Sequence, residues 1–438
     1  MSPSSIAHCA AIWLALFGST YAQSQGPAPG RQPAPVRTSP PAAQQAEKTP
    51  AQRPVQPAAH QEVLPEVAPL PGEQMYYEGE GPVFADDWGT CGPGGCNFCG
   101  QRGPGCGPFG QGCLSGVYVR AEYLLWGAKG ATLPPLVTSS PPGTAQNVAG
   151  ILGEPDTVIL FGDETVNNDL RSGGRLVLGW WFDPCRRLGI EGDYFSLDDE
   201  STDFRASSTG TTIIGVPFYD VVQGIENVNL VAFPNLIQGT IAADYRTTFQ
   251  GAGIRAMYNL ACGEGGGCSW ITGCPVHTGF RFDMLLGYRF VRLDDNFTLV
   301  ENSVSLSTAN PGSFNIRDQF DTENQFHGID LGTSLSFCKG CFSLEMLSKI
   351  ALGNTHSVTT INGSTIITQN GISETFPGGI FAQRTNSGTF EDDQFAVVPE
   401  LGVMAGYQIN PCWRVTVGYT FIYWSQVARA GDQIDREL

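Results

Sequence analysis

The stretch "HTGFRFDMLLGYRFVRL", residues 277–293, decides the fold, because it separates into two faces when alternate positions are taken. One face is wholly apolar and carries Phe280, Phe282, Met284, Leu286, Tyr288 and Phe290. The other face carries His277, Gly279, Arg281, Asp283, Gly287 and Arg289, with Leu285 as its main exception. Successive side chains of a β-strand point to opposite faces, so the stretch predicts one strand with an apolar face and a charged face.

The same alternation recurs from residue 116 onward and predicts nine amphipathic strands, most of about ten residues. Besides the opening stretch and a segment near 242–260, it appears in "GVYVRAEYLLW", "RLVLGWWF", "RLGIEGDYFSL", "HGIDLGTSLSF", "FSLEMLSKIAL", "FAVVPELGVMAGY" and "WRVTVGYTFIYW". A soluble β-sandwich also alternates, but its strands are shorter and its apolar faces are hidden. Long strands with continuous aromatic faces favour an antiparallel transmembrane β-barrel.

The connections between these strands alternate between short and long. Short ones fall at 183–187, 261–275, 338–341 and 410–412, and long ones at about 127–171, 198–240, 294–316 and 355–392. Outer-membrane barrels have short periplasmic turns and longer external loops, and an even strand number. We therefore expect about ten strands, within a range of 8–12, with the tenth supplied by residues 425–438 or by "NVNLVAF". A change of phase at Gly251 and Gly253 predicts a β-bulge in the 242–260 strand.

Composition and the first residues place the chain outside the cytoplasm. A formal net charge of −18 argues against nucleic-acid binding, which needs clustered basic residues. Residues 1–22 read as a cleaved signal peptide, 23–88 as a disordered Pro-rich spacer, 89–114 as a Cys/Gly-rich segment and 115–438 as the barrel. After the signal no run of 18 apolar residues occurs, so no transmembrane helix is expected.

The cysteines of the exported chain are expected to form disulfides at the end of the barrel that carries the short turns. Twelve cysteines follow the predicted cleavage site, and an exported chain favours their oxidation. Two pairs, Cys96 with Cys99 and Cys338 with Cys341, have the spacing of zinc ligands, but no histidine lies nearby and disulfides are the preferred reading. The candidates are Cys91, Cys96, Cys99, Cys106, Cys113, Cys185, Cys262, Cys268, Cys274, Cys338, Cys341 and Cys412.

Charged residues opposite the apolar faces are expected to line the lumen, with no metal or cofactor among them. They are Arg120, Glu122, Arg175, Glu191, Asp193, Arg281, Asp283, Arg289, Glu345 and Arg414. Neither a G-x-S-x-G nor an H-E-x-x-H nor a phosphate loop with its lysine occurs, so catalysis is not expected. Acidic clusters at 198–200, 294–295 and 391–393 either bind divalent cations or mark the edge of the apolar surface, and the second reading is preferred.

The stretches "VYVRAEYLLWGAKGATLPPLVT", "GGRLVLGWWFDPCRRLGIEGDYFSL" and "WRVTVGYTFIYWSQVARAGDQIDREL" resemble the BBP7 family, β-barrel porins of the planctomycete outer membrane. The likeness covers roughly residues 115–438, and "ARAGDQIDR" is its most distinctive part. It implies a barrel in the bacterial outer membrane, contacting its lipid. We expect a porin-like protein with a narrow channel for ions or small solutes. The alternative is a non-conducting structural or adhesive scaffold, tied to a cell-wall or periplasmic partner through residues 23–88.

Overall fold

The computed structural model describes residues 21–22, 116–183, 186–268, 275–308, 311–410 and 413–438. The predicted spacer and Cys/Gly-rich segment, and the signal peptide up to residue 20, lie outside these ranges, so they remain predictions. In the described part of the chain, no helix is long and apolar enough to cross a membrane.

The described residues form eighteen strands and one short 3-10 helix. The strands are β1 (Tyr21–Ala22), β2 (Val117–Ala128), β3 (Ala131–Leu133), β4 (Val137–Ser139), β5 (Val158–Phe161), β6 (Glu164–Val166), β7 (Leu170–Trp181), β8 (Leu188–Leu197), β9 (Glu200–Ser208), β10 (Ile214–Asp220), β11 (Ile225–Ala232), β12 (Ile237–Cys268), β13 (Pro275–Ser305), β14 (Gly312–Lys339), β15 (Phe342–Gln369), β16 (Ile372–Pro377), β17 (Gly388–Asn410) and β18 (Trp413–Ile422). The helix η1 spans Ala430–Gln433.

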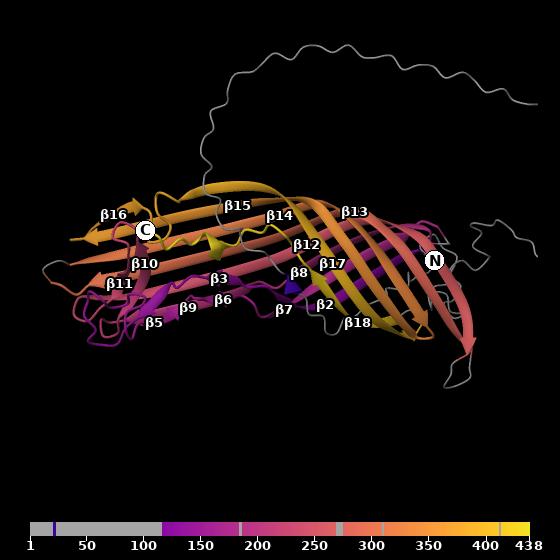
Figure 1. Ribbon diagram of the computed structural model, residues 1–438, viewed down its shortest axis with the longest axis horizontal. Helices are drawn as coiled ribbons and strands as arrows, with labels where there is room; N and C mark the ends of the chain where they lie inside the picture. Colours follow the sequence, from indigo (N-terminus) through magenta and orange to yellow (C-terminus); the bar gives the residue numbers. More distant parts are fainter. Residues whose placement is uncertain (1–20, 23–115, 184–185, 269–274, 309–310, 411–412) are drawn as a thin grey trace, which may run out of the picture. The chain divides into compact units, whose positions relative to one another are not determined.

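The nine long strands of the large sheet form one antiparallel sheet that curls around an interior, and in the described residues its edge strands β2 and β18 are not paired with each other (Figure 1). Its order is β1-β2-β7-β8-β12-β13-β14-β15-β17-β18, and β9 continues the line of β8 by pairing with β12. Arg120 on β2 lies 3.8 Å from Glu345 on β15, and Arg175 on β7 lies 3.9 Å from Glu400 on β17. The curvature therefore brings early and late strands face to face across the interior.

The path contains nine long strands, and its tenth member is the two-residue β1, which pairs in parallel with β2. Neither source proposed for a tenth strand joins the barrel. Residues 227–233 belong mostly to β11, which lies in a separate sheet. Residues 425–438 contain η1 instead of a barrel strand, because their apolar side chains are buried inside against the wall rather than turned outward.

The outward and inward faces exchange character partway along the barrel strands. In the half of β13 that begins at a short turn, Leu286 points outward with 49% of its surface exposed, while Arg289 points inward and is buried. Further along the same strand, Phe297 and Leu299 are buried inside, and the outward positions hold polar residues such as Asn296. We call the outward apolar surface the apolar band and the part beyond it the extension. Exposed members of the band include Val117, Tyr123, Leu176, Leu178, Trp180, Ile190, Tyr194, Ile254, Tyr258, Phe280, Met284, Leu286, Tyr288, Ile329, Leu331, Phe337, Leu344, Met346, Leu401, Val403, Tyr407, Val417 and Tyr419.

This reversal explains two sequence-based predictions that were wrong. The stretches 294–316 and 355–392 are mostly strand in β13 to β17 instead of long loops, because alternation continues there with its polarity reversed. The bulge predicted at Gly251 and Gly253 is not there: β12 keeps its register with β13 through both residues, and the shift lies between Asn259 and Ala261. Gly251 instead leaves room for the ring of Phe195, which would lie 2.5 Å from an added Cβ.

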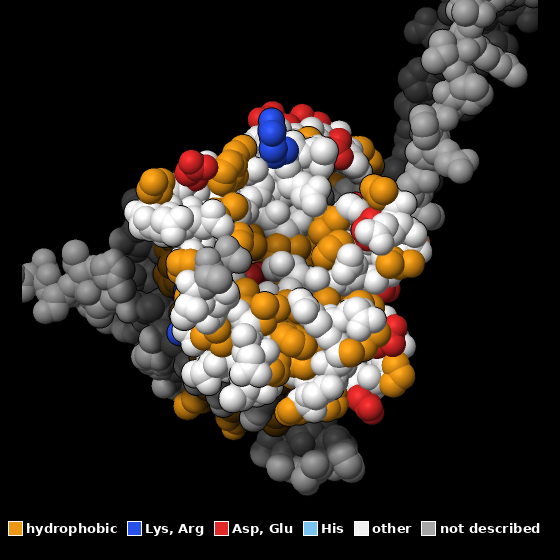
Figure 2. All heavy atoms as spheres, turned by 90° about the vertical axis from the view of Figure 1, so that its left-hand side faces the viewer, with side chains coloured by type: hydrophobic (Ala, Val, Ile, Leu, Met, Phe, Trp, Pro, Cys, Tyr) orange, Lys and Arg blue, Asp and Glu red, His pale blue; other side chains and the backbone are white. Residues whose placement is uncertain are grey.

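The extension has its own core and two small sheets, β11-β10-β4-β5 and β3-β6. Buried aromatic side chains of the barrel strands, including Tyr245, Phe297 and Phe320, pack there against Leu133 and Ile214 of the small sheets. Figure 2 faces the end at which β10, β11 and β16 lie, with hydrophobic side chains around its middle and acidic ones mostly toward its margin. The extension thus folds like a water-soluble sheet structure above the apolar band.

Candidate functional site in the barrel interior

Along the barrel strands, starting from the short turns, the interior contains three successive regions. Charged side chains fill the half inside the apolar band, an apolar layer follows, and a polar network around Asp295 lies beyond it. Each arises from the same alternation, because every second residue of a barrel strand points inward. The inward residues therefore decide whether anything can pass.

Glu400 on β17 is the centre of the charged half, and its side chain is only 2% exposed. Its carboxylate lies 2.5 Å from Arg289 Nη1 and 2.9 Å from Lys349 Nζ. Arg175 Nη1 approaches it at the longer distance of 3.9 Å. A buried carboxylate is tolerated only with such compensation, so these residues form one interdependent unit that joins β7, β13, β15 and β17.

Two further guanidinium groups connect other strands of the wall. Arg255 on β12 contacts Asp193 closely and lies 3.4 Å from Glu191, both on β8, and 3.6 Å from Asp330 on β14. Arg120 on β2 lies 2.8 Å from Glu122 on the same strand and 3.8 Å from Glu345 on β15. Because acids and bases are interleaved, the lining has no extended surface of one sign that would select cations or anions.

Nearer the short turns, Arg281 and Asp283 form a buried pair with 2.6 Å between Nε and Oδ2. The guanidinium of Arg281 lies 4.1 Å from the centroid of the Trp181 ring and donates to the carbonyl oxygen of Arg186. Asn259 Nδ2 donates to Asp283 at 2.8 Å. These side chains are held by several partners at once and leave little freedom for solute to move among them.

The ten residues expected to line the lumen all come together in this charged half. Eight border one cavity of about 140 Å³: Arg120, Arg175, Glu191, Asp193, Arg281, Asp283, Glu345 and Arg414. The other two, Glu122 and Arg289, pair with charged residues at its border. A cavity of this size holds a few water molecules rather than a continuous aqueous channel.

Four further charged residues belong to the same cluster but were not among the ten predicted lumen residues: Arg255, Asp330, Lys349 and Glu400. The signal was present for each of them. Lys349 has the same parity as Glu345 on β15, and Glu400 has the parity of the buried Ala396 and Val398 on β17. Counting every charged residue on the inward parity would have found all four.

The apolar layer crosses the interior beyond the charged half. Eight of the nine long strands contribute to it, and it comprises Leu124, Trp126, Phe195, Leu197, Phe249, Val291, Phe326, Ala351, Ala396, Val398, Ile422, Trp424 and Val427. The Trp126 and Phe195 rings lie 5.2 Å apart, and Trp424 lies 6.3 Å from Phe326. Hydration water is lost in such a layer, so ions meet a barrier there.

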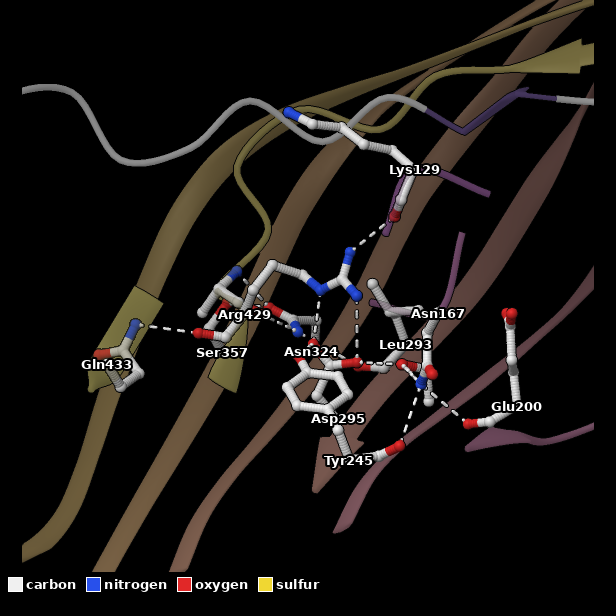
Figure 3. A network of polar contacts seen from close by, with 12 residues as sticks. Lys129, Asn167, Glu200, Tyr245, Leu293, Asp295, Asn324, Ser357, Arg429 and Gln433 are labelled. Atoms are coloured by element: carbon white, nitrogen blue, oxygen red, sulfur yellow. Dashed lines mark hydrogen bonds and ion pairs between the residues drawn. The ribbon is translucent and has the colours of Figure 1, made fainter. Parts of the chain in front are cut away.

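Beyond this layer, the buried carboxylate of Asp295 gathers a polar network (Figure 3). Arg429 donates to both of its oxygens, at 2.5 Å from Nε and 3.3 Å from Nη2. Tyr245 and Thr247 each donate a hydroxyl to it at 2.8 Å. Asp294 and Asp295 were predicted to form one acidic cluster, but alternation turns Asp295 inward, where it is 2% exposed, and leaves Asp294 outside.

Two cysteines near the short turns, Cys262 and Cys338, are each disulfide-bonded, whereas Cys341 is a free, exposed thiol, which makes it wrong as a disulfide candidate. The turn between β14 and β15 leaves its side chain in solvent. For Cys268 and the remaining candidates, the side chains lie outside the described residues. Among the described residues, no group of three or more His, Cys, Asp and Glu side chains could hold a metal ion.

Comparison with known protein families identifies a match over most of the chain. The family model described as "Putative beta barrel porin-7 (BBP7)" matches residues 118–438, which contain every long strand from β7 onward and nearly all of β2. No curated protein and no solved structure matches the chain.

Proposed function

The chain belongs to the BBP7 family of β-barrel porins, and from this premise we propose that it is a bacterial outer-membrane barrel that is closed in the conformation described. Its role in that state is to anchor the extension at the membrane surface rather than to pass solutes freely. Outer-membrane lipid is its first partner, in contact with the apolar band. A cell-wall or periplasmic partner reached through residues 23–88 belongs to the same proposal.

The apolar band supports a membrane location. Its side chains are large, exposed and continuous over the outward face of all nine long strands. Soluble proteins rarely expose an apolar surface of that extent, whereas a spanning barrel requires one about 25 Å tall. The charged residues of the same strands point inward, as in membrane barrels with polar interiors.

The single observation that carries the closed state is the apolar layer across the interior. Nine long strands make a narrow barrel, close to the eight-stranded size at which side chains just fill the lumen. Here the filling includes Trp126, Phe195, Phe249, Phe326 and Trp424. An ion would lose most of its hydration shell on entering this layer, where few polar groups could replace the lost water.

A narrow channel for ions or small solutes is the second candidate, and the charged half of the interior favours it. That half contains a cavity of about 140 Å³ bordered by arginine and carboxylate side chains. The proposal assigns no enzymatic reaction to these groups, because the carboxylates described there are engaged with guanidinium or ammonium groups in ion pairs. An acid–base catalyst would need a carboxyl group left accessible to a substrate.

Planar-bilayer recording separates the two candidates. The full chain is folded in detergent, its folded state is verified by a heat-modifiable gel shift, and it is added to a bilayer at increasing concentration. The closed-barrel proposal expects no stepwise conductance, while a 16-stranded porin added to the same bilayer conducts. Regular conductance steps from the intact chain would contradict it and establish the narrow channel.

A further inference from the structure

We propose that residues 427–438 are a separable plug. The residues of the wall and of the extension that contact them, which we call the seat, form a binding site for an arginine-bearing segment. When residues 427–438 leave the seat, the barrel opens to ions. This inference rests on the proposed function, since it concerns how the closed state is maintained. We call residues 427–438 the plug segment. It carries the distinctive sequence "ARAGDQIDR".

The chain leaves the barrel wall at a defined point. Tyr423 and Ser425 still donate backbone hydrogen bonds to the carbonyl oxygens of Pro399 and Val397, so the wall pairing of β18 continues to Ser425. Gln426 then has a φ of 57°, a left-handed conformation unusual for a residue other than glycine. The turn at Gln426 directs the next residue, Val427, into the apolar layer.

The first part of the plug segment is held by side chains of the wall. Asn324 on β14 donates from Nδ2 to the Ala428 carbonyl oxygen and accepts the Ala428 N–H at Oδ1, both at 2.8 Å. Arg429 next forms its two-pronged contact with Asp295 and donates from Nη1 to the Lys129 carbonyl oxygen at 3.0 Å. Arg429 and Asp295 are both buried, so the pair is protected from water (Figure 3).

The rest of the plug segment fits the extension closely. Ala430 and Ile434 are buried in its core, and an added Cβ on Gly431 would lie 2.4 Å from the Thr132 carbonyl oxygen. Arg436 lies 2.6 Å from Glu226. Tyr219 on β10 donates its N–H to the Arg436 carbonyl oxygen and accepts the Leu438 N–H, at 2.7 and 2.8 Å. The seat is thus a built groove that recognises both backbone and side chains.

The plug segment is nevertheless separable from the wall. The hydrogen-bonded ladder from β2 to β18 contains none of its residues, and its own contacts go to side chains of the wall and to the extension. Among the described residues, Asp295 supplies the buried carboxylate that binds Arg429. Removing the segment takes Val427 out of the apolar layer and deprives the buried Asp295 carboxylate of Arg429, while Tyr245 and Thr247 still donate to it. A buried carboxylate without its cation attracts water and cations.

The test compares the full chain with a chain lacking residues 427–438, each folded in detergent and recorded in planar bilayers. The intact chain is expected to be silent and the shortened chain to conduct ions. A synthetic peptide with the sequence of residues 427–438 should bind the shortened chain, measured by fluorescence anisotropy, and stop the conductance. A peptide with Arg429→Ala should bind about 10- to 100-fold more weakly, because it lacks the charged hydrogen bonds to Asp295.

Point variants keep the test decisive if the shortened chain does not fold. Asp295→Asn removes the charge that binds Arg429 and should produce intermittent conductance in the full chain. Asp294→Asn is the matched control, one residue away on the outward face, and should remain silent. A folded shortened chain that stays silent, or one that does not bind the peptide, overturns the plug and leaves the closed barrel standing. Conductance by the intact wild-type chain contradicts the proposed function itself.

Discussion

Glu301 is a carboxylic acid enclosed by the extension, and its environment changes its protonation. It is 2% exposed and accepts hydrogen bonds from Asn229 Nδ2 at 2.7 Å and Ser303 Oγ at 3.2 Å. Burial raises its pKa from 4.5 to about 7, although both hydrogen bonds act in the opposite direction. The folded protein therefore holds this proton at pH values at which an unfolded chain has released it.

Glu301 should make the extension less stable as the pH rises. Its contribution is fully present below pH 4.5 and is lost as the pH rises through about 7. The loss is on the order of 3 kcal/mol, since one pKa unit is about 1.4 kcal/mol. Thermal unfolding in detergent, followed by circular dichroism from pH 5 to pH 8, should show this decline in wild type and a smaller one in Glu301→Gln. Glu323→Gln, on the outward face of β14, is the control, and equal slopes in wild type and Glu301→Gln would contradict the assignment.

At the scale of residues, alternation predicted which side chains face inward but not which of them meet. Arg175 and Glu122 are neighbours across one strand pair, so their approach could be anticipated from the two strands alone. The approach of Arg175 to Glu400 could not, because it depends on the curvature that brings β7 opposite β17. Asp295 was misread for a related reason: a count of acidic residues ignores the face on which each one lies.

At the scale of elements, the sequence predicted where strands begin at the short turns more reliably than where they end. Those turns interrupt the pattern with proline, glycine and cysteine, as in 183–187 and 410–412. At the other end, β12 to β15 pass from a lipid-type to a water-type environment without a break in backbone pairing. Periodicity reports the surroundings of a strand as well as its geometry, so a change of surroundings was read as an end or as a bulge.

The two edges of the barrel sheet should be its least protected strands. In the described part of the chain, β18 pairs only with β17, and β2 pairs with β7 and, over two residues, with β1. β13 and β14 have a full-length partner on each side. Hydrogen–deuterium exchange in detergent should therefore be roughly tenfold or more faster in β2 and β18 than in β13 and β14. Equal protection would show that the two edges are closed by further pairing.

At the scale of the whole molecule, the same sheet has two different outward surfaces, an apolar one in the apolar band and a polar one in the extension. At the level of the apolar band, the inward face of the sheet is charged and its outward face is apolar. In the extension, the inward face is apolar and the outward face is polar. This division was not predicted, because the expected barrel ended where the reversal begins. The same substitution should therefore lower the free energy of unfolding by different amounts in the apolar band and in the extension, even on one strand.

Placing arginine on the outward face of β13 tests that implication. Leu286→Arg puts a charge in the apolar band and should destabilise the barrel in lipid by about 2–4 kcal/mol if it lies near the bilayer midplane. Thr298→Arg is the matched control, on the same strand and face but in the extension, and should cost little. Urea unfolding in lipid vesicles, followed by tryptophan fluorescence, measures both. Similar losses for the two variants would mean that the apolar band does not contact lipid.

The odd number of long strands gives assembly of this protein a direction. β2 starts beside the end of β7, and β18 starts beside the end of β17, so both run away from the short turns. The described chain consequently enters β2 at the end of the wall that carries the short turns and leaves β18 at the opposite end. Under the proposed membrane location, insertion would therefore carry residues 427–438, with their charged side chains, to the side of the membrane away from the short turns. Anything joined after residue 438 would be exported with them, which makes that position a natural point of surface display.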